Sequence, residues 1–116
     1  MSHSGIEDFA KQLLAQVHTT SELKNVSVAL ETLSQSKSFK SNTNAIVNDH
    51  RLTDGAKKSQ LLDLISEIEI SIIEDFFRDI LDAKEFWLFD SDKFDYFDEF
   101  VQKFQLLTET VKVINI

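Results

Sequence analysis

The chain has 116 residues, of which 42% are hydrophobic and 28% are charged, and this length fits one domain with a core of its own. It contains no proline, no cysteine and only two glycines, which disfavours a turn-rich β-sandwich and excludes disulfides, thiolate nucleophiles and cysteine-bound metals. The formal net charge is −8. Nucleic-acid phosphates require a positively charged surface, so we expect no nucleic-acid partner.

Two capping boxes predict the first two helices. Ser4 with Glu7, and Thr19 with Glu22, have the spacing at which each side chain satisfies a free backbone N–H at a helix start. Apolar residues then recur at helical spacing, as Ile6, Phe9, Ala10, Leu13, Leu14 and Val17 after the first box, and as Leu23, Val26, Ala29, Leu30 and Leu33 after the second. The polar stretch 34–38 ends the second helix.

Two shorter helices are expected in the middle of the chain. The third is indicated by the spacing of Phe39, Thr43, Ile46 and Val47. Thr53 can cap the fourth, which has Gly55 in its first turn. Its inward residues are Leu61, Leu62 and Ile65.

The fifth helix has the strongest apolar pattern, and a sixth follows it. The wide apolar face of the fifth comprises Ile68, Ile72, Ile73, Phe76, Phe77, Ile80 and Leu81. Such a width indicates contact with more than one neighbour. Residues 85–89 are predicted to form an apolar connector. Asp90 or Ser91 is then expected to cap the last helix. The stripe of that helix is Phe94, Phe97, Phe100, Val101, Phe104 and Leu107.

These patterns together predict an all-α fold, a compact bundle of five to six helices that forms a single domain over residues 1–116. The tail, about residues 110–116, is rich in β-branched side chains, which favours an extended piece after the last helix. No apolar run approaches the ~20 residues that cross a bilayer, so we expect no direct membrane insertion. The N-terminus lacks the pattern of a secretory signal, which favours a cytosol-facing domain.

The sequence offers no catalytic, cofactor or metal site. The three histidines, His3, His18 and His50, are scattered and form no pair at metal-binding spacing. Asp90 and Asp92 could open a calcium loop. However, three required positions of such a loop hold unsuitable residues. The next ligand position is Phe94, the glycine position is Asp95, and the closing glutamate position is Val101. The acidic cluster between Asp90 and Glu99 is therefore interpreted as a capped and solvated helix start, stabilised by the positive end of the helix dipole.

Four segments carry a resemblance to a known family. Residues 9–14, Phe-Ala-Lys-Gln-Leu-Leu, look like its opening Tyr-Ala-Lys-Ala-Leu-Phe. Residues 52–62 are similar to its fourth helix, in which an acidic residue precedes Lys-Lys and Leu-Leu. Residues 72–81 look like its apolar fifth helix, and residues 94–104 like its sixth, where an acidic residue precedes Phe. In this order they resemble the N-terminal domain of the F-type ATP synthase delta subunit, whose mitochondrial counterpart is the oligomycin-sensitivity-conferring protein.

The resemblance implies a non-catalytic part of the peripheral stalk, or stator. In that family a six-helix bundle binds the N-terminal amphipathic helix of an alpha subunit in a groove between helices one and five. It thereby ties the F1 head to the peripheral stalk, so that the head cannot turn with the rotor. Carried over here, the groove would comprise Ala10, Leu13, Leu14, Val17, Ile72, Ile73, Phe76, Phe77 and Ile80. The implied location is the cytoplasmic face of the inner membrane, through the complex. Contact with the b subunits is implied only if a second domain follows.

Two other interpretations stay open. The first is a generic helical adaptor that binds a different amphipathic helix. The second is a small hydrolase or metal enzyme that uses the acids between Asp90 and Glu99. One departure from the family is also visible, because Glu85-Phe86 stands where the family usually has a Gly-Arg pair between helices five and six.

Overall fold

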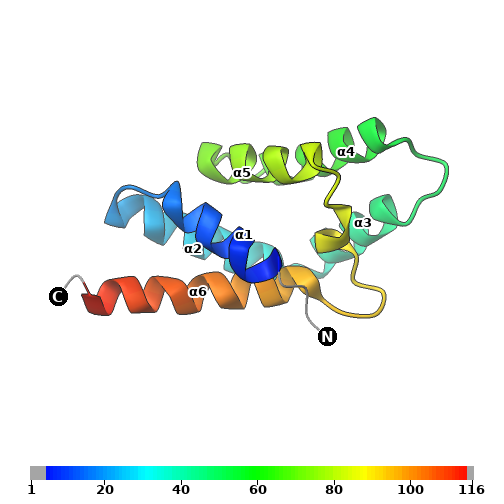
Figure 1. Cartoon of the computed structure of the whole chain (residues 1–116). Coiled ribbons are helices and arrows are strands. Elements are labelled where there is room, and N and C mark those ends of the chain that lie inside the picture. Colours follow the sequence, from blue (N-terminus) through cyan, green and yellow to red (C-terminus); the bar gives the residue numbers. More distant parts are fainter. Residues whose placement is uncertain (1–4, 115–116) are drawn as a thin grey trace.

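The structure is a computed structural model that describes residues 5–114, and the side chains of residues 5–109 (Figure 1). Its elements are α1 (Gly5–Ala15), α2 (Thr20–Gln35), α3 (Lys37–Val47), α4 (Asp54–Ser66), α5 (Ser71–Asp82), the 3-10 helix η1 (Phe86–Phe89) and α6 (Tyr96–Ile114). No strand occurs within the described residues. The prediction of an all-α bundle is confirmed, and the radius of gyration of 14.0 Å is close to the value of roughly 13 Å expected for a compact domain of this size.

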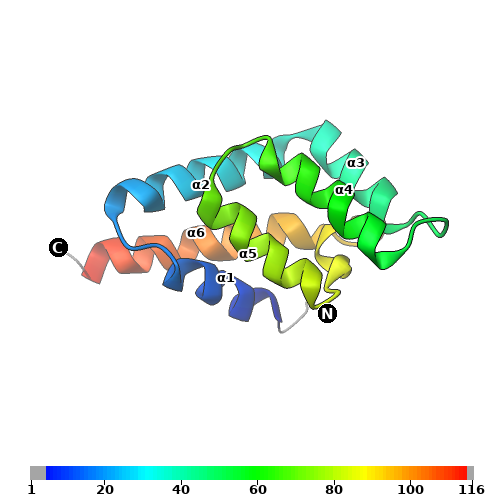
Figure 2. The same ribbon diagram turned by 90° about the horizontal axis from the view of Figure 1, so that it is seen from above.

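The helices pack in two groups that meet at one end. α6 is the longest helix, and both α1 and α2 pack against it. α4 and α5 form a second pair, which lies above the first group in Figure 1; in Figure 2, α5 passes in front of α6. α3 contacts α4 and η1, so these elements close the end of the bundle from which α6 starts.

Side chains cap the starts of α2, α3 and α4. The capping box predicted at Thr19 and Glu22 is present, because the Thr19 hydroxyl accepts from the Glu22 N–H at 3.0 Å and the Glu22 carboxylate accepts from the Thr19 N–H at 3.2 Å. Thr53 accepts from the Ala56 N–H at 3.1 Å, as predicted. Ser36 caps α3 in the same way. The box predicted at Ser4 lies outside the described residues.

The expected cap of the last helix was wrong. Neither Asp90 nor Ser91 caps α6; instead, the Asp95 carboxylate accepts from the Asp98 N–H at 3.0 Å. The chain between Asp90 and Asp95 is held by polar contacts to α3, so the helix begins only at Tyr96. Phe94, expected in the apolar stripe, therefore precedes the helix and is 47% exposed.

Two other boundaries also differ from expectation. α6 continues through Ile114, so the expected extended tail is wrong for residues 110–114, and residues 115–116 lie outside the described part. Valine and isoleucine cost a helix only roughly a few tenths of a kcal/mol each, which an established helix tolerates. Ile68, expected in the fifth helix, lies in the connection before α5, where Glu69 turns the chain with a φ of 56°.

Five phenylalanines form an aromatic cluster at the centre of the core. Phe76 and Phe77 come from α5, Phe89 from η1, and Phe97 and Phe100 from α6. Neighbouring ring centroids lie 5.1 to 6.2 Å apart, within the range of favourable aromatic pairs. The connector predicted at 85–89 is thus a short 3-10 helix that adds Leu88 and Phe89 to the core.

α5 ends in a Schellman motif built without glycine. The Glu85 N–H donates to the Ile80 carbonyl at 3.2 Å, and the Lys84 N–H donates to the Leu81 carbonyl at 3.0 Å. Lys84 occupies the left-handed position with a φ of 61°. Such a residue costs about 1–2 kcal/mol relative to a right-handed conformation unless it is glycine.

Candidate partner-binding surface

The nine side chains that the family resemblance assigned to a groove fall into two sets, one buried in the core and one at its edge. Six of them are at most 4% exposed and belong to the core: Ala10, Leu13, Ile73, Phe76, Phe77 and Ile80. The other three, Leu14, Val17 and Ile72, are partly buried and pack against that core. A partner can therefore reach only these three of the nine without opening the bundle.

The buried members hold α1 and α5 in place. Phe76 stacks on Phe100 of α6 at 5.7 Å, and Phe77 contacts rings from both η1 and α6. Removing either side chain would leave a cavity among rings of neighbouring elements. Periodicity identified the inward face of both helices correctly. It could not separate the centre of that face from its edges, because the neighbouring helices decide which edge is covered.

Charged side chains flank the reachable apolar residues. On α1, Glu7 and Lys11 form an exposed ion pair at 3.9 Å. On α5, Arg78 pairs with Asp75 at 2.8 Å. Exposed pairs of this kind contribute about 0–1 kcal/mol to stability, so they add little to the stability of the fold.

A cleft that sequence reasoning missed lies beside Ile72. It occupies about 260 Å³ between α2 and the start of α5. Val26, Ile70 and Ile72 supply apolar wall, and Glu22 and Glu69 supply carboxylates. Because its walls are about 50 residues apart in the sequence, no local pattern could have revealed it. The cleft extends the reachable surface of α5 and gives it an acidic border.

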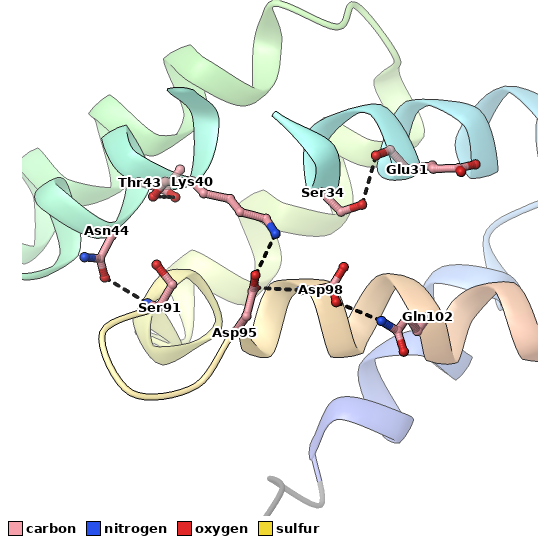
Figure 3. Close-up of polar contacts among 9 residues, drawn as sticks. All are labelled: Glu31, Ser34, Lys40, Thr43, Asn44, Ser91, Asp95, Asp98 and Gln102. Atoms are coloured by element: carbon pink, nitrogen blue, oxygen red, sulfur yellow. Dashed lines mark hydrogen bonds and ion pairs between the residues drawn. The ribbon is translucent and has the colours of Figure 1, made fainter. Parts of the chain in front are cut away.

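The acidic cluster near the start of α6 is occupied by contacts within the chain (Figure 3). The Asp95 carboxylate accepts from Lys40 at 2.6 Å, and the Asp92 carboxylate accepts from the Asn44 amide at 2.8 Å. The Asn44 side chain also accepts from the Ser91 N–H at 2.8 Å, which ties this segment to α3. The Asp98 carboxylate accepts from the Gln102 amide at 2.8 Å. The Asp92 and Asp95 carboxylates therefore join the segment before α6 to α3, whereas the Asp98 contact lies within α6.

Within residues 5–114, no group of three or more histidine, cysteine, aspartate or glutamate side chains is arranged to hold a metal ion. One carboxylate oxygen, Oε2 of Glu99, is buried with no hydrogen-bond partner. A single buried oxygen is neither a metal ligand set nor a nucleophile with its base. None of the described helices combines the length and apolar character needed to cross a membrane.

Comparison with protein-family models, with curated proteins and with solved structures finds no match.

Proposed function

We propose that this chain is a non-catalytic domain of the peripheral stalk of an F-type ATP synthase, and that it binds the N-terminal helix of an alpha subunit along α1 and α5. The observation that carries the proposal is that Leu14, Val17 and Ile72 are apolar, only partly buried and packed against the core, so each keeps surface that a partner can cover. An amphipathic helix can bury its apolar stripe on such an edge without rearranging the bundle.

The charge of the domain supports a basic partner. The chain carries 20 acidic and 12 Lys or Arg residues, and Glu22 and Glu69 border the cleft beside Ile72. Complementary charge at the rim raises the association rate and sets the direction of the bound helix. In this proposal the domain works mechanically, by holding the head of the enzyme to its stalk. It sits on the cytoplasmic face of the membrane through the complex, and it contacts b subunits only through a further domain.

The proposal is tested by titrating the ¹⁵N-labelled chain with a synthetic peptide of an alpha-subunit N-terminal helix. We expect amide shifts to concentrate around Leu14, Val17 and Ile72. A peptide in which serine replaces each apolar residue of the stripe is the matched control, and it should cause no shifts. A spectrum that stays unchanged at high concentrations of the native peptide rules the stator function out.

A generic adaptor for another amphipathic helix is the second candidate. The 260 Å³ cleft favours it, because this cleft lies between α2 and α5 and so widens the surface beyond the α1 edge. If a pull-down recovers a partner unrelated to ATP synthase, and the alpha-subunit peptide does not compete with that partner, the adaptor function replaces the stator function.

A further inference from the structure

A second groove lies between α3 and α4, and it shares no lining residue with the cleft beside Ile72. One cleft of about 430 Å³ is lined by Ala45, Ile46, Asp49, Asp63 and other residues, and a second of about 290 Å³ is lined by Phe39, Glu67, Ile68 and others. Asn42 and Leu64 line both clefts, so the two adjoin. We call the combined feature the α3–α4 groove. Figures 1 and 2 show α3 and α4 at the end of the bundle away from the C-terminal end of α6.

The groove has an apolar floor and an acidic rim. Ile46, Leu52 and Leu64 are partly buried apolar residues that line the larger cleft. Asp63 and Glu67, both exposed, stand on the α4 side, and neither takes part in an ion pair within the described residues. Asp49 is already paired with Arg51 at 3.0 Å. Neither lysine nor arginine is among the lining residues of the two clefts.

The length, the helical walls and the acidic rim of the groove fit one kind of partner, a short basic helix. The α4 side runs from Gln60 to Glu67, about two helical turns or ~10 Å, which matches a short helix. The walls are helices with no sheet edge to extend, so a third helix packed against both is the fitting geometry. Its apolar stripe would face Ile46 and Leu64, and lysine or arginine beside the stripe would meet Asp63 and Glu67.

We propose that the α3–α4 groove is a second partner site, which binds a short basic amphipathic helix of another protein. The site is independent of the proposed stator function, because it shares no residue with the α1–α5 surface. A domain with two such sites can hold two helical segments at once.

The test uses a 14-residue helical peptide with leucine at positions i, i+3, i+4 and i+7 and lysine at the flanking positions. Its binding to the ¹⁵N-labelled chain is followed by amide shifts, and its Kd by fluorescence anisotropy. A scrambled peptide of the same composition is the control for unspecific charge attraction. We expect shifts around Asn42, Ala45 and Leu64, and binding by the scrambled peptide at least about tenfold weaker.

Three variants complete the test. Ala45→Arg fills the larger cleft with a cation from an exposed helical position, and Asp63→Lys reverses the charge of the rim. Each should raise the Kd about tenfold, whereas Glu109→Lys on α6, with the same charge change as Asp63→Lys, should alter it less than about twofold. Circular dichroism is the check that each variant folds.

The proposal is overturned if Ala45→Arg leaves the Kd unchanged, if shifts spread over the whole surface, or if no binding occurs at millimolar peptide. Shifts confined to α1 and α5 also overturn it, and that result would leave the stator function standing. Conversely, failure of the alpha-subunit peptide to bind would leave this groove proposal intact.

Discussion

Lys40 of α3 and Asp95, the residue before α6, are joined by an ion pair of 2.6 Å that also fixes where α6 begins. One oxygen of the Asp95 carboxylate accepts from the Lys40 ammonium, and the other accepts from the Asp98 N–H. Their side chains are 29% and 35% exposed, so solvent screens the pair less than it screens the exposed pairs on α1 and α5. One carboxylate therefore caps a helix and joins two helices distant in sequence.

We expect Asp95→Ala to lower the free energy of unfolding by about 2 kcal/mol. Loss of the cap accounts for about 1 kcal/mol, and loss of the charged hydrogen bond to Lys40 for about the same. Lys40→Met should cost only the second part, because it leaves the cap in place. Urea denaturation measures both. Equal losses in the two variants would show that the cap contributes nothing.

The left-handed residue at the end of α5 predicts a stabilising change. Lys84→Gly should raise the free energy of unfolding by about 0.5–1 kcal/mol, since glycine adopts the φ of 61° without a steric cost. The variant loses an exposed contact between Lys84 and Asp54 at 3.7 Å, which is worth little. Lys84→Ala keeps the steric cost and serves as the control. A melting temperature for Lys84→Gly at or below that of Lys84→Ala contradicts this explanation.

The aromatic cluster predicts a sharp contrast between two phenylalanines. Phe77→Leu should cost at least about 1.5 kcal/mol, because Phe77 packs on four other rings in a fully buried site. Phe94→Leu, at a position 47% exposed, should cost less than about 0.5 kcal/mol. Thermal denaturation of both variants compares them directly, and similar losses would refute the assignment of Phe77 to the centre of the core.

The proposed partner surface predicts a selective loss of binding. Ile72→Glu should weaken binding of the alpha-subunit peptide at least about tenfold, because it places a charge on the apolar edge. Val28→Glu on α2 is the matched control, since Val28 is apolar and 55% exposed but lies outside the proposed surface. Isothermal titration calorimetry gives both Kd values. If Ile72→Glu binds the peptide as tightly as Val28→Glu does, Ile72 is not part of the binding surface.

The Asp49 carboxyl leads to a prediction about how the stability of the fold depends on pH. A hydrogen bond from the Arg51 side chain, and a second from its backbone N–H, lower the pKa of the Asp49 carboxyl below its usual value near 3.8. The ionised carboxylate therefore stabilises the fold above the unfolded pKa, and this contribution is lost as the pH falls through the lower folded pKa. Carbon-13 NMR titration should show the Asp49 pKa rising in Arg51→Gln and unchanged in Arg78→Gln. If the Asp49 pKa does not rise in Arg51→Gln, the Arg51 side chain is not what lowers it.

The sequence predicted the helices better than it predicted the site. Local signals were sufficient for the elements, because Thr19, Thr53 and the apolar spacing act within a few residues. The start of α6 was misplaced because Asp90, Ser91 and Asp95 all have side chains that can cap a helix. Contacts to Lys40 and Asn44, about 50 residues away, decide among them.

The site could be predicted only as far as the inward faces of α1 and α5. Phe76 and Leu14 carry the same apolar signal in the sequence, yet one is 1% exposed and the other lies at an edge. The difference depends on where α6 lies against these helices, and no periodicity encodes that. The α3–α4 groove was missed for the same reason, since its walls become adjacent only after folding.

The aromatic cluster also bears on the order in which the chain assembles. Its rings all come from residues 76–100, so bringing them together closes only short loops, whereas docking α1 onto α6 closes a loop of most of the chain. We therefore expect α5, η1 and α6 to form an early nucleus to which α1 attaches late. In native-state hydrogen exchange, the amides of α1 should then open before those of α5, and the reverse order would contradict this sequence of events.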